Sequence, residues 1–426
     1  MILSSVSTAR AAFQSRRFRF SSSQTKLADL FHDPQSTTTG TGRRRVVGTF
    51  ASTTATASSE AVSALTERMR VEAEEEMSRV IEFFDSSLAS SSLSKNVRLL
   101  QTPQDAFDYV DQNIDTVLFD CDGVVYRSPD PVPGAADCIR SLLQRNKQVY
   151  FVTNNAGSNR RQLREKLNTI LQLNSDDDNN ESDSKQSKSQ QLTEDMMISS
   201  SYSCAQYLKQ TMGTAATSLY VIGSSGLCDE LRETGFTVFG GPTPPDQPSS
   251  MTRDELVEYD FEQYGSAVDA VVVGHDTDFN FRKLCIANVL LQRNAACQLI
   301  ATNRDAFDLV GEDSRQIAGN GCVVAALEYS SKRTAINCGK PSQTLADLIA
   351  RQVLEKTSQP WDPARTLMVG DRLDTDILFG KTFGMQSALV LTGVTLAEKI
   401  QSLVIDGEPD DEPLPTVILP HIGYMA

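Results

Sequence analysis

Short apolar runs alternate with longer helical patterns along most of the chain. Runs rich in β-branched and aromatic residues occur at 116–119, 148–152, 270–273, 298–301 and 366–369. Helical segments separate these runs. The alternation predicts an α/β fold, in which helices cover the faces of a parallel sheet. In such sheets ligands bind at the carboxyl ends of the strands, so the residues that follow each run are candidates for a site.

A helical pattern precedes the alternation, at residues 60–84. Its apolar residues recur at helical spacing among charged ones: Val62, Leu65, Met69, Val71, Met77, Val80, Ile81 and Phe84. The spacing predicts an amphipathic helix within an N-terminal helical extension at 60–112. We expect the apolar face of this helix to pack on the rest of the protein, and a role in assembly is the alternative.

Two stretches lack a hydrophobic pattern. Residues 174–191 contain no apolar side chain, and residues 35–60 are rich in Thr, Ser, Gly and Ala. Segments of this composition cannot bury enough apolar surface to fold. We therefore predict a disordered loop insertion at 174–191 and a disordered linker before the helix.

Residues 1–28 are rich in Ser, Ala and Arg and contain no acidic residue. Arginines interrupt their apolar positions, so the apolar core of a secretory signal is missing. This composition is typical of an organellar transit peptide, and we predict a transit peptide and linker at 1–59. The stretch Arg17–Ser22 is similar to a mitochondrial processing site, so we expect the mitochondrion. Chloroplast transit peptides share the composition and are the alternative, and an ordinary tail is a third interpretation.

Composition narrows the classes of partner. At 426 residues the chain exceeds an average domain, and its formal charge of −15 disfavours nucleic acid and anionic lipid. No apolar run approaches the length needed to cross a bilayer. We therefore expect no nucleic acid and no membrane as partners. The eight cysteines form no C-x-x-C pair and the three histidines are scattered, which argues against zinc ribbons, disulfide scaffolds and a Ser-His-Asp triad.

The first polar cluster follows the run 116–119. It places two carboxylates, Asp120 and Asp122, two positions apart before a turn at Gly123. Around such a turn one carboxylate can attack phosphorus while the other moves a proton. The pair alone is a weak signal, because calcium loops and metal-dependent transferases also contain it. The calcium-loop interpretation fails here because the rest of that loop is absent.

The second and third clusters supply groups that suit a phosphate. Thr153, Asn154 and Asn155 follow the run 148–152 and offer a hydroxyl and backbone N–H groups near a helix start. Lys340 stands between a glycine and a proline, which restrict the backbone and suit a fixed countercharge to phosphate and to a carboxylate. Each match means little by itself, since helix caps and surface lysines are common.

The fourth cluster follows the run 366–369 and contains Asp371, Asp374 and Asp376. Acidic residues in the first turn of a helix are favoured by the helix dipole, so capping explains at least one of them. Their number at a strand end also fits a hard cation with oxygen ligands. Beside a phosphate that cation is usually Mg²⁺.

The order of these four clusters resembles that of the haloacid dehalogenase (HAD) superfamily. Within it the chain is similar to the p-nitrophenylphosphatase-like group, which includes phosphoglycolate phosphatases and pyridoxal phosphatases. The resemblance covers residues 117–395. It is carried by DCDGVVYR, FVTNNAGSNR, VVVGHDTDFNFRKL, ATNRDAF, AGNGCVVAALE, CGKPS and MVGDRLDTDILFG.

The resemblance implies a role for each cluster. Asp120 would be the nucleophile that forms an aspartyl-phosphate, and Asp122 the general acid and base. Mg²⁺ would be held by Asp120, by the backbone carbonyl of Asp122 and by Asp371. Thr153, with Asn154, Asn155 and Lys340, would bind the phosphoryl group of the substrate. Asp376 and Asp374 would lie one layer further out, where they would orient Lys340 or metal-bound water.

The resemblance also implies two domains. A HAD-type, Rossmann-like core with a parallel sheet would comprise 113–212 and 333–426. An inserted α/β cap of the C2a type, at 213–332, would close over the core, exclude water and read the organic part of the substrate. Caps of this type often form dimer contacts, so a homodimer is an open expectation.

The expected substrate is a small phosphorylated metabolite. Pyridoxal phosphatases carry a histidine for the vitamin ring where this chain has Asp308, which we take as a substrate-binding position. The ATNRDAF and MVGDRLDTDILFG segments are similar to phosphoglycolate phosphatases of photosynthetic organisms. We therefore expect Mg²⁺-dependent hydrolysis of 2-phosphoglycolate to glycolate and phosphate. A broad-specificity phosphatase acting on 4-nitrophenyl or pyridoxal phosphate is the main alternative, and an inactive HAD-fold scaffold is an alternative of another class.

Overall fold

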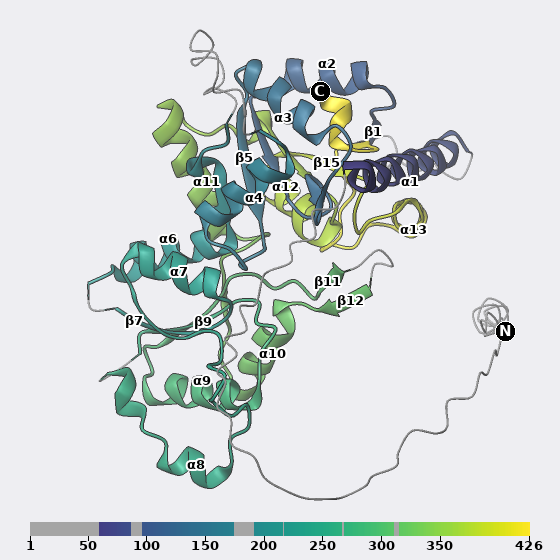
Figure 1. Cartoon of the computed structure of the whole chain (residues 1–426). Coiled ribbons are helices and arrows are strands. Elements are labelled where there is room, and N and C mark those ends of the chain that lie inside the picture. The colour runs from purple at the N-terminus through teal and green to yellow at the C-terminus, as the bar shows by residue number, and fades with distance from the viewer. Residues whose placement is uncertain (1–58, 87–95, 174–190, 216, 266–267, 311–314) are drawn as a thin grey trace, which may run out of the picture. The chain divides into compact units, whose positions relative to one another are not determined.

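The computed structural model describes most of the chain after the N-terminal segment (Figure 1). The described residues are 59–86, 96–173, 191–215, 217–265, 268–310 and 315–426. Residues 1–58 of the predicted transit peptide and linker (1–59) and residues 174–190 of the predicted loop (174–191) lie outside them. Within the described residues, no helix is both long enough and apolar enough to cross a membrane.

A seven-stranded sheet forms the centre of the larger domain. Every pairing in it is parallel, and the strand order is β1-β16-β15-β14-β2-β5-β6. The strands are β1 (Arg98–Leu99), β2 (Thr116–Phe119), β5 (Gln148–Thr153), β6 (Met197–Ser199), β14 (Thr366–Gly370), β15 (Gln386–Val390) and β16 (Val417–Leu419). The predicted α/β class with a parallel sheet is confirmed.

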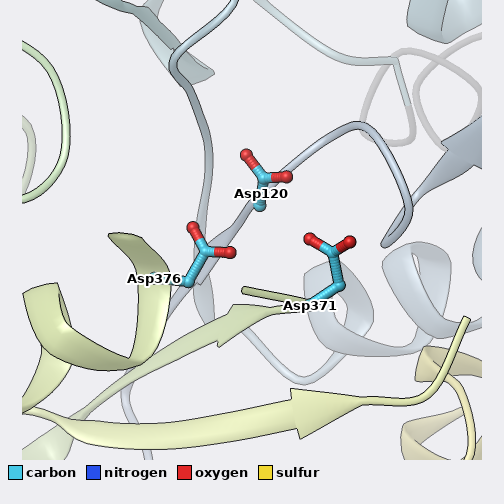
Figure 2. A group of neighbouring side chains, drawn as sticks. All are labelled: Asp120, Asp371 and Asp376. Carbon is cyan, nitrogen blue, oxygen red and sulfur yellow. The ribbon is translucent and has the colours of Figure 1, made fainter. Parts of the chain in front are cut away.

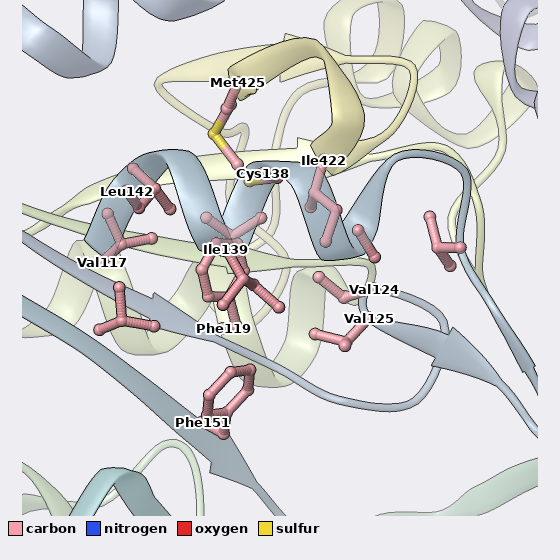
Figure 3. Close-up of a cluster of buried hydrophobic side chains, with 14 of the residues drawn as sticks. Val117, Phe119, Val124, Val125, Cys138, Ile139, Leu142, Phe151, Ile422 and Met425 are labelled. Carbon is pink, nitrogen blue, oxygen red and sulfur yellow. The ribbon is translucent and has the colours of Figure 1, made fainter. Parts of the chain in front are cut away.

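Both faces of this sheet are buried. Along β2, Val117 and Phe119 join one apolar cluster and Leu118 joins another, because successive side chains of a strand point to opposite faces. Figure 3 shows the first cluster. Burial of each large side chain contributes roughly 1.5–3 kcal/mol. The helices that contribute to the first cluster include α2 (Pro103–Asn113), α3 (Ala135–Gln144) and α4 (Arg160–Ile170), and those that contribute to the second include α6 (Ser200–Met212), α11 (Gln343–Thr357) and α12 (Leu378–Thr382).

The predicted N-terminal helix is present as α1 (Ser59–Asp85). Its inward residues Met69, Ala73, Met77 and Val80 are almost fully buried. They follow helical spacing and pack toward the sheet and α13 (Ala397–Asp406). The Thr66 hydroxyl also donates to the Pro131 carbonyl at 3.2 Å, and the Glu76 carboxylate accepts from the Ala397 N–H at 2.8 Å. The helix is therefore packed on the core, as expected.

A second, five-stranded sheet is inserted between α6 and α11. It is also parallel, with the order β13-β10-β9-β7-β8. Its strands are β7 (Ser218–Ile222), β8 (Thr237–Gly240), β9 (Ala270–Val273), β10 (Gln298–Ala301) and β13 (Ile336–Asn337), and its helices are α7 (Ser225–Thr234), α8 (Arg253–Glu258), α9 (Phe281–Arg293) and α10 (Asn320–Ser331). We call this part the cap. Because β13 belongs to its sheet, the chain passes from the cap to Lys340 within three residues.

Two antiparallel hairpins, four short 3₁₀ helices and one short π-helix complete the described fold. One hairpin lies in the core and the other in the cap. These elements are β3 (Tyr126–Arg127), β4 (Asp130–Pro131), β11 (Phe307–Val310), β12 (Arg315–Ala318), η4 (Glu194–Met196), η5 (Phe261–Tyr264), η6 (Pro363–Arg365), η7 (Leu373–Ile377) and η8 (Ile422–Met425).

The cap is anchored to the loop that precedes α4. Glu230 of α7 is 1% exposed, and its carboxylate accepts from the backbone N–H of Arg160 at 2.9 Å and from its Nε at 3.1 Å. A carboxylate at a helix N-terminus is favoured by the helix dipole. At Gly226 a Cβ would lie 2.4 Å from the Gly157 carbonyl, so only glycine allows α7 to approach this loop so closely. Helix α7 of the cap is therefore in direct contact with the loop that follows the second polar cluster.

Candidate active site

The polar clusters meet at one edge of the core sheet. β14, β2 and β5 are neighbours in register, so Asp371, Asp120 and Thr153 emerge side by side at the carboxyl ends of these strands. Lys340 reaches the same place from the segment that follows β13. The parallel sheet therefore brings the four clusters, which are far apart in the sequence, together at a single site.

Lys340 is the buried cation of this site, with 2% of its surface exposed. Its Nζ lies 2.5 Å from Asp120 Oδ1 and 2.7 Å from Asp376 Oδ1, and it donates to the Val152 carbonyl at 2.7 Å. Burial by itself would lower the pKa of Lys340, but the two carboxylates outweigh it and raise the pKa above its usual value. The ammonium is therefore charged and fixed beside Asp120.

Three carboxylates, Asp120, Asp371 and Asp376, point toward a common position (Figure 2). Each offers one oxygen within 4.8 Å of those of the others. Burial, together with the neighbouring acids, raises the pKa of Asp120 and raises that of Asp371 to about 7. Lys340 supplies one positive charge to three acids, so a divalent cation would complete the neutralisation.

Asp371 is the carboxylate best prepared for a metal. Its Oδ2 accepts from the Val394 N–H at 2.8 Å, whereas its Oδ1 is buried and has no hydrogen-bond partner among the described residues. At Gly123, which has a φ of +81°, a Cβ would lie 2.6 Å from Asp371 Oδ2. The turn after Asp122 can therefore close onto this carboxylate only with glycine. An unpaired oxygen in an acidic cluster fits a hard cation with oxygen ligands.

Asp122 lies apart from this acidic cluster and faces the cavity. The Tyr126 hydroxyl donates to its Oδ2 at 3.1 Å. Desolvation by the surrounding residues raises the pKa of Asp122. The positive charge of Lys166 and the hydrogen bonds from Tyr126 and Asn155 partly offset this rise. A carboxyl held in this way can carry a proton to or from a group in the cavity.

The residues at the end of β5 and just after it have different contacts. Thr153 is 4% exposed and lines the cavity, with its hydroxyl accepting from the Asn155 N–H at 3.1 Å. The Asn154 side chain accepts from the Lys340 N–H at 2.7 Å and donates to Asp305 at 2.8 Å. Asn154 thus holds the backbone of Lys340 in place. Its predicted contact with substrate stays a prediction, as does that of Asn155.

Two further predicted residues have other partners. Asp374 receives two bonds from the Arg372 guanidinium, at 3.1 and 2.8 Å, and does not join the buried cluster. Asp308 is half exposed on β11 and lies 3.7 Å from His275 Nδ1, at the cap side of the cavity. Their predicted roles, in orienting Lys340 and in binding substrate, stay predictions.

A cavity of about 700 Å³ connects these groups. Core, cap and α1 all contribute to its walls. The lining side chains discussed above and below are Leu65, Arg68, Asp120, Asp122, Arg127, Thr153, Asn154, Asn155, Lys166, His275, Asp305, Asp308, Lys340, Asp371, Arg372 and Asp376. Its volume lies in the range of small-molecule sites.

Comparison with known proteins shows the family of the chain. The model of the haloacid dehalogenase-like hydrolases matches residues 117–237, and a HAD-hydrolase-like model matches residues 337–419. Phosphoglycolate phosphatase 2 of Arabidopsis thaliana is 36% identical over 70% of this chain and 89% of its own length. The chain belongs to the haloacid dehalogenase-like hydrolases.

Other relatives of this HAD hydrolase are phosphatases as well. The chloroplastic phosphoglycolate phosphatase 1A of Arabidopsis thaliana is 33% identical over 76% of this chain and 81% of its own length. Human glycerol-3-phosphate phosphatase is 38% identical over 66% of this chain and 80% of its own length. The predicted enzyme class, a HAD phosphatase, is confirmed.

Solved structures share the fold. The p-nitrophenyl phosphatase of Archaeoglobus fulgidus is 24% identical, has a TM-score of 0.55, and the match covers 74% of this chain and 98% of that one. A glycerol phosphate phosphatase of Mycobacterium tuberculosis in complex with magnesium is 24% identical, with a TM-score of 0.53 and coverage of 74% and 77%. The predicted HAD-type core with its cap is thereby confirmed at the level of fold.

Several cavity residues of this HAD phosphatase were not predicted from the sequence. Asp305 lies in the ATNRDAF segment, and burial raises its pKa to about 6. Arg372 lies next to Asp371, and its guanidinium contacts the ring and the carbonyl of Phe307 in the cap. Both were visible within segments that carry the family resemblance. Lys166 and Arg68 stand in ordinary helical patterns, where nothing in the sequence separates them from surface residues.

Proposed function

We propose that the protein is a Mg²⁺-dependent phosphomonoesterase that hydrolyses 2-phosphoglycolate to glycolate and phosphate through an aspartyl-phosphate on Asp120. The observation that carries the proposal is the contact of Asp120 with the buried ammonium of Lys340, beside two further acids and within a cavity. Two relatives named phosphoglycolate phosphatase support the choice of substrate.

In the first step the Asp120 carboxylate attacks the phosphorus of the ester. The bond from phosphorus to the bridging oxygen breaks, and Asp122 gives its proton to that oxygen as the alcohol leaves. In the second step Asp122 takes a proton from water as the water oxygen attacks phosphorus. The bond to Asp120 then breaks, phosphate is released and both carboxyl groups return to their starting forms.

The surrounding residues make the approach of two anions feasible. Lys340 is fixed by Asp120, Asp376 and the Val152 carbonyl, so its charge needs no rearrangement when the phosphoryl group arrives. Thr153 would donate its hydroxyl to a phosphoryl oxygen. Cap contacts around the cavity would limit the entry of water.

Mg²⁺ fits the acidic cluster. Asp120, Asp371 and the backbone carbonyl of Asp122 would hold it, with Asp376 beside them. The unpaired buried oxygen of Asp371 and the raised pKa values of Asp120 and Asp371 support a cation at this position. When bound, the ion supplies positive charge that stabilises the transferring phosphoryl group. The magnesium complex of the Mycobacterium tuberculosis relative in fold agrees with this choice.

A second candidate substrate is glycerol 3-phosphate, because the human enzyme named for it is 38% identical. A broad phosphatase acting on aryl or pyridoxal phosphate is the third. Catalytic efficiencies on 2-phosphoglycolate, glycerol 3-phosphate, pyridoxal phosphate and 4-nitrophenyl phosphate would decide. We expect at least a tenfold preference for 2-phosphoglycolate, and a smaller one would defeat this part of the proposal.

We further propose that residues 1–59 direct the protein to an organelle, with the mitochondrion as the expected one. The chloroplastic location in the name of one relative favours the alternative. A fluorescent protein fused behind residues 1–59 would separate the two, and a fusion that stays in the cytosol would contradict both.

A further inference from the structure

Among the described residues, one lysine of the cavity, Lys166, makes no salt bridge. Lys340 contacts Asp120, and Arg372 is bound by Asp374. Within the part of the chain that the structure describes, no carboxylate lies within 4 Å of the Lys166 ammonium. The contact that it does make is with the Tyr126 ring, whose centroid is 3.9 Å from Nζ. An aromatic face attracts a cation but leaves its charge available to an anion.

The arginines of the cavity differ from Lys166 in this respect. Arg68 and Arg127 both approach Glu72 of α1, at 3.5 and 3.9 Å. Their positive charge is therefore partly met by a carboxylate of the protein itself. Lys166 is half-buried and lines the same cavity, so it is the cation whose pairing with a bound anion requires no other salt bridge to break.

The position of Lys166 points to the leaving-group side of the site. Its ammonium lies over the ring of Tyr126, and the hydroxyl of the same residue donates to Asp122 Oδ2 at 3.1 Å. In the proposed reaction Asp122 protonates the bridging oxygen of the ester. A group on the substrate that is close to this oxygen is therefore also close to Lys166.

We propose that Lys166 binds the carboxylate of the leaving group and thereby selects phosphate monoesters whose alcohol carries an anion next to the ester oxygen. The inference rests on the proposed function. In 2-phosphoglycolate a single methylene carbon separates the carboxylate from the bridging oxygen, which matches the proximity of Lys166 to Asp122. Glycerol 3-phosphate and 4-nitrophenyl phosphate present no anion there. Charge-assisted hydrogen bonds are about twice as strong as neutral ones, so the discrimination is measurable.

The test is the variant Lys166→Met in the full chain. We expect its kcat/KM for 2-phosphoglycolate to fall at least tenfold, mainly through a higher KM, because a contact present in both bound substrate and transition state is lost. Any effect of the lost charge on Asp122 is common to all substrates, so the ratio of kcat/KM for 2-phosphoglycolate to kcat/KM for glycerol 3-phosphate should itself fall at least tenfold. Measurable activity on glycerol 3-phosphate and 4-nitrophenyl phosphate shows that the variant is folded. Lys166→Arg should recover part of the lost efficiency.

The matched control is Lys332→Met. Lys332 is the residue that follows the last residue of α10 in the cap, and its ammonium also lies over an aromatic ring, 4.1 Å from the centroid of Tyr329, outside the cavity. Its loss should leave all three substrates unaffected. If Lys166→Met instead lowers activity on all substrates equally, Lys166 acts through Asp122 and the inference is wrong. The inference would also be overturned if Arg127→Gln selectively lowered kcat/KM for 2-phosphoglycolate while Lys166→Met did not.

Failure of the proposed function would look different. A wild-type enzyme without preference for 2-phosphoglycolate would remove that function. The inference would then be tested on 2-phospholactate against glycerol 3-phosphate. A drop confined to the carboxylated ester in Lys166→Met would support it, and equal changes would contradict it.

Discussion

Replacing Lys340 by Met removes the only positive charge that the described residues bring into contact with Asp120. The ammonium lies 2.5 Å from Asp120 Oδ1 and 2.7 Å from Asp376 Oδ1. At an effective dielectric constant near 20, one such contact is worth roughly 6 kcal/mol. Part of this is regained, because the carboxylates can take up protons once the ammonium is gone.

Removal of one partner of a buried ion pair therefore costs roughly 3–5 kcal/mol in total. If this cost falls on the transition state, kcat/KM decreases by about two to four orders of magnitude, at roughly 1.4 kcal/mol per factor of ten. Lys340→Met should show this loss in phosphate release with saturating Mg²⁺. Lys381→Met, which removes an exposed lysine 3.0 Å from Glu408, is the control and should stay within twofold of wild type.

Circular dichroism at the assay temperature would establish that both variants are folded. A folded Lys340→Met enzyme that keeps more than a third of the wild-type efficiency would refute the reasoning, since the charge would then not contribute to the reaction.

The remaining predictions concern stability. Met77 of α1 is 3% exposed, so Met77→Ala should lower the free energy of unfolding, measured by chemical denaturation, by about 2–5 kcal/mol. Val71→Ala, on the exposed side of the helix, should change it by less than about 0.5 kcal/mol. Equal effects of the two substitutions would contradict the packing of α1. Burial lowers the pKa of His421 from 6.5 to about 4. Between these values the unfolded state binds the proton and the folded state does not, so this residue removes up to about 3 kcal/mol of stability as the pH falls from 6.5 to 4. His421→Gln should flatten the pH dependence of the unfolding free energy in that window, and an unchanged slope would show that His421 is not the group responsible.

The sequence predicted the strands that carry the site because their apolar runs are continuous and their ends are polar. Every run named from the pattern became a strand, and the parallel order brought Asp120, Thr153 and Asp371 together. β13 was not predicted, because two residues are too few to form a pattern. Lys340 was found only through its glycine and proline neighbours.

Side-chain direction could not be read from the sequence. Asp374 and Asp376 are two positions apart in a tight turn, yet one pairs with Arg372 on the rim and the other with Lys340 in the interior. A pattern places both at a strand end but does not give the rotation of the turn. Likewise, the helical spacing predicted α1, but its contribution of Arg68 to the cavity depends on where the helix packs.

In the proposed reaction Asp120 carries the phosphoryl group between the two steps. The most direct measurement is mass spectrometry of acid-quenched enzyme after mixing with 4-nitrophenyl phosphate and Mg²⁺, using Asp122→Asn so that the second step is slowed. This substrate suits the test because its leaving group needs no protonation. We predict one phosphoryl group on the peptide that contains Asp120, and none in Asp120→Asn. Phosphorylation at another residue, or steady turnover by Asp120→Asn, would show that Asp120 is not the nucleophile.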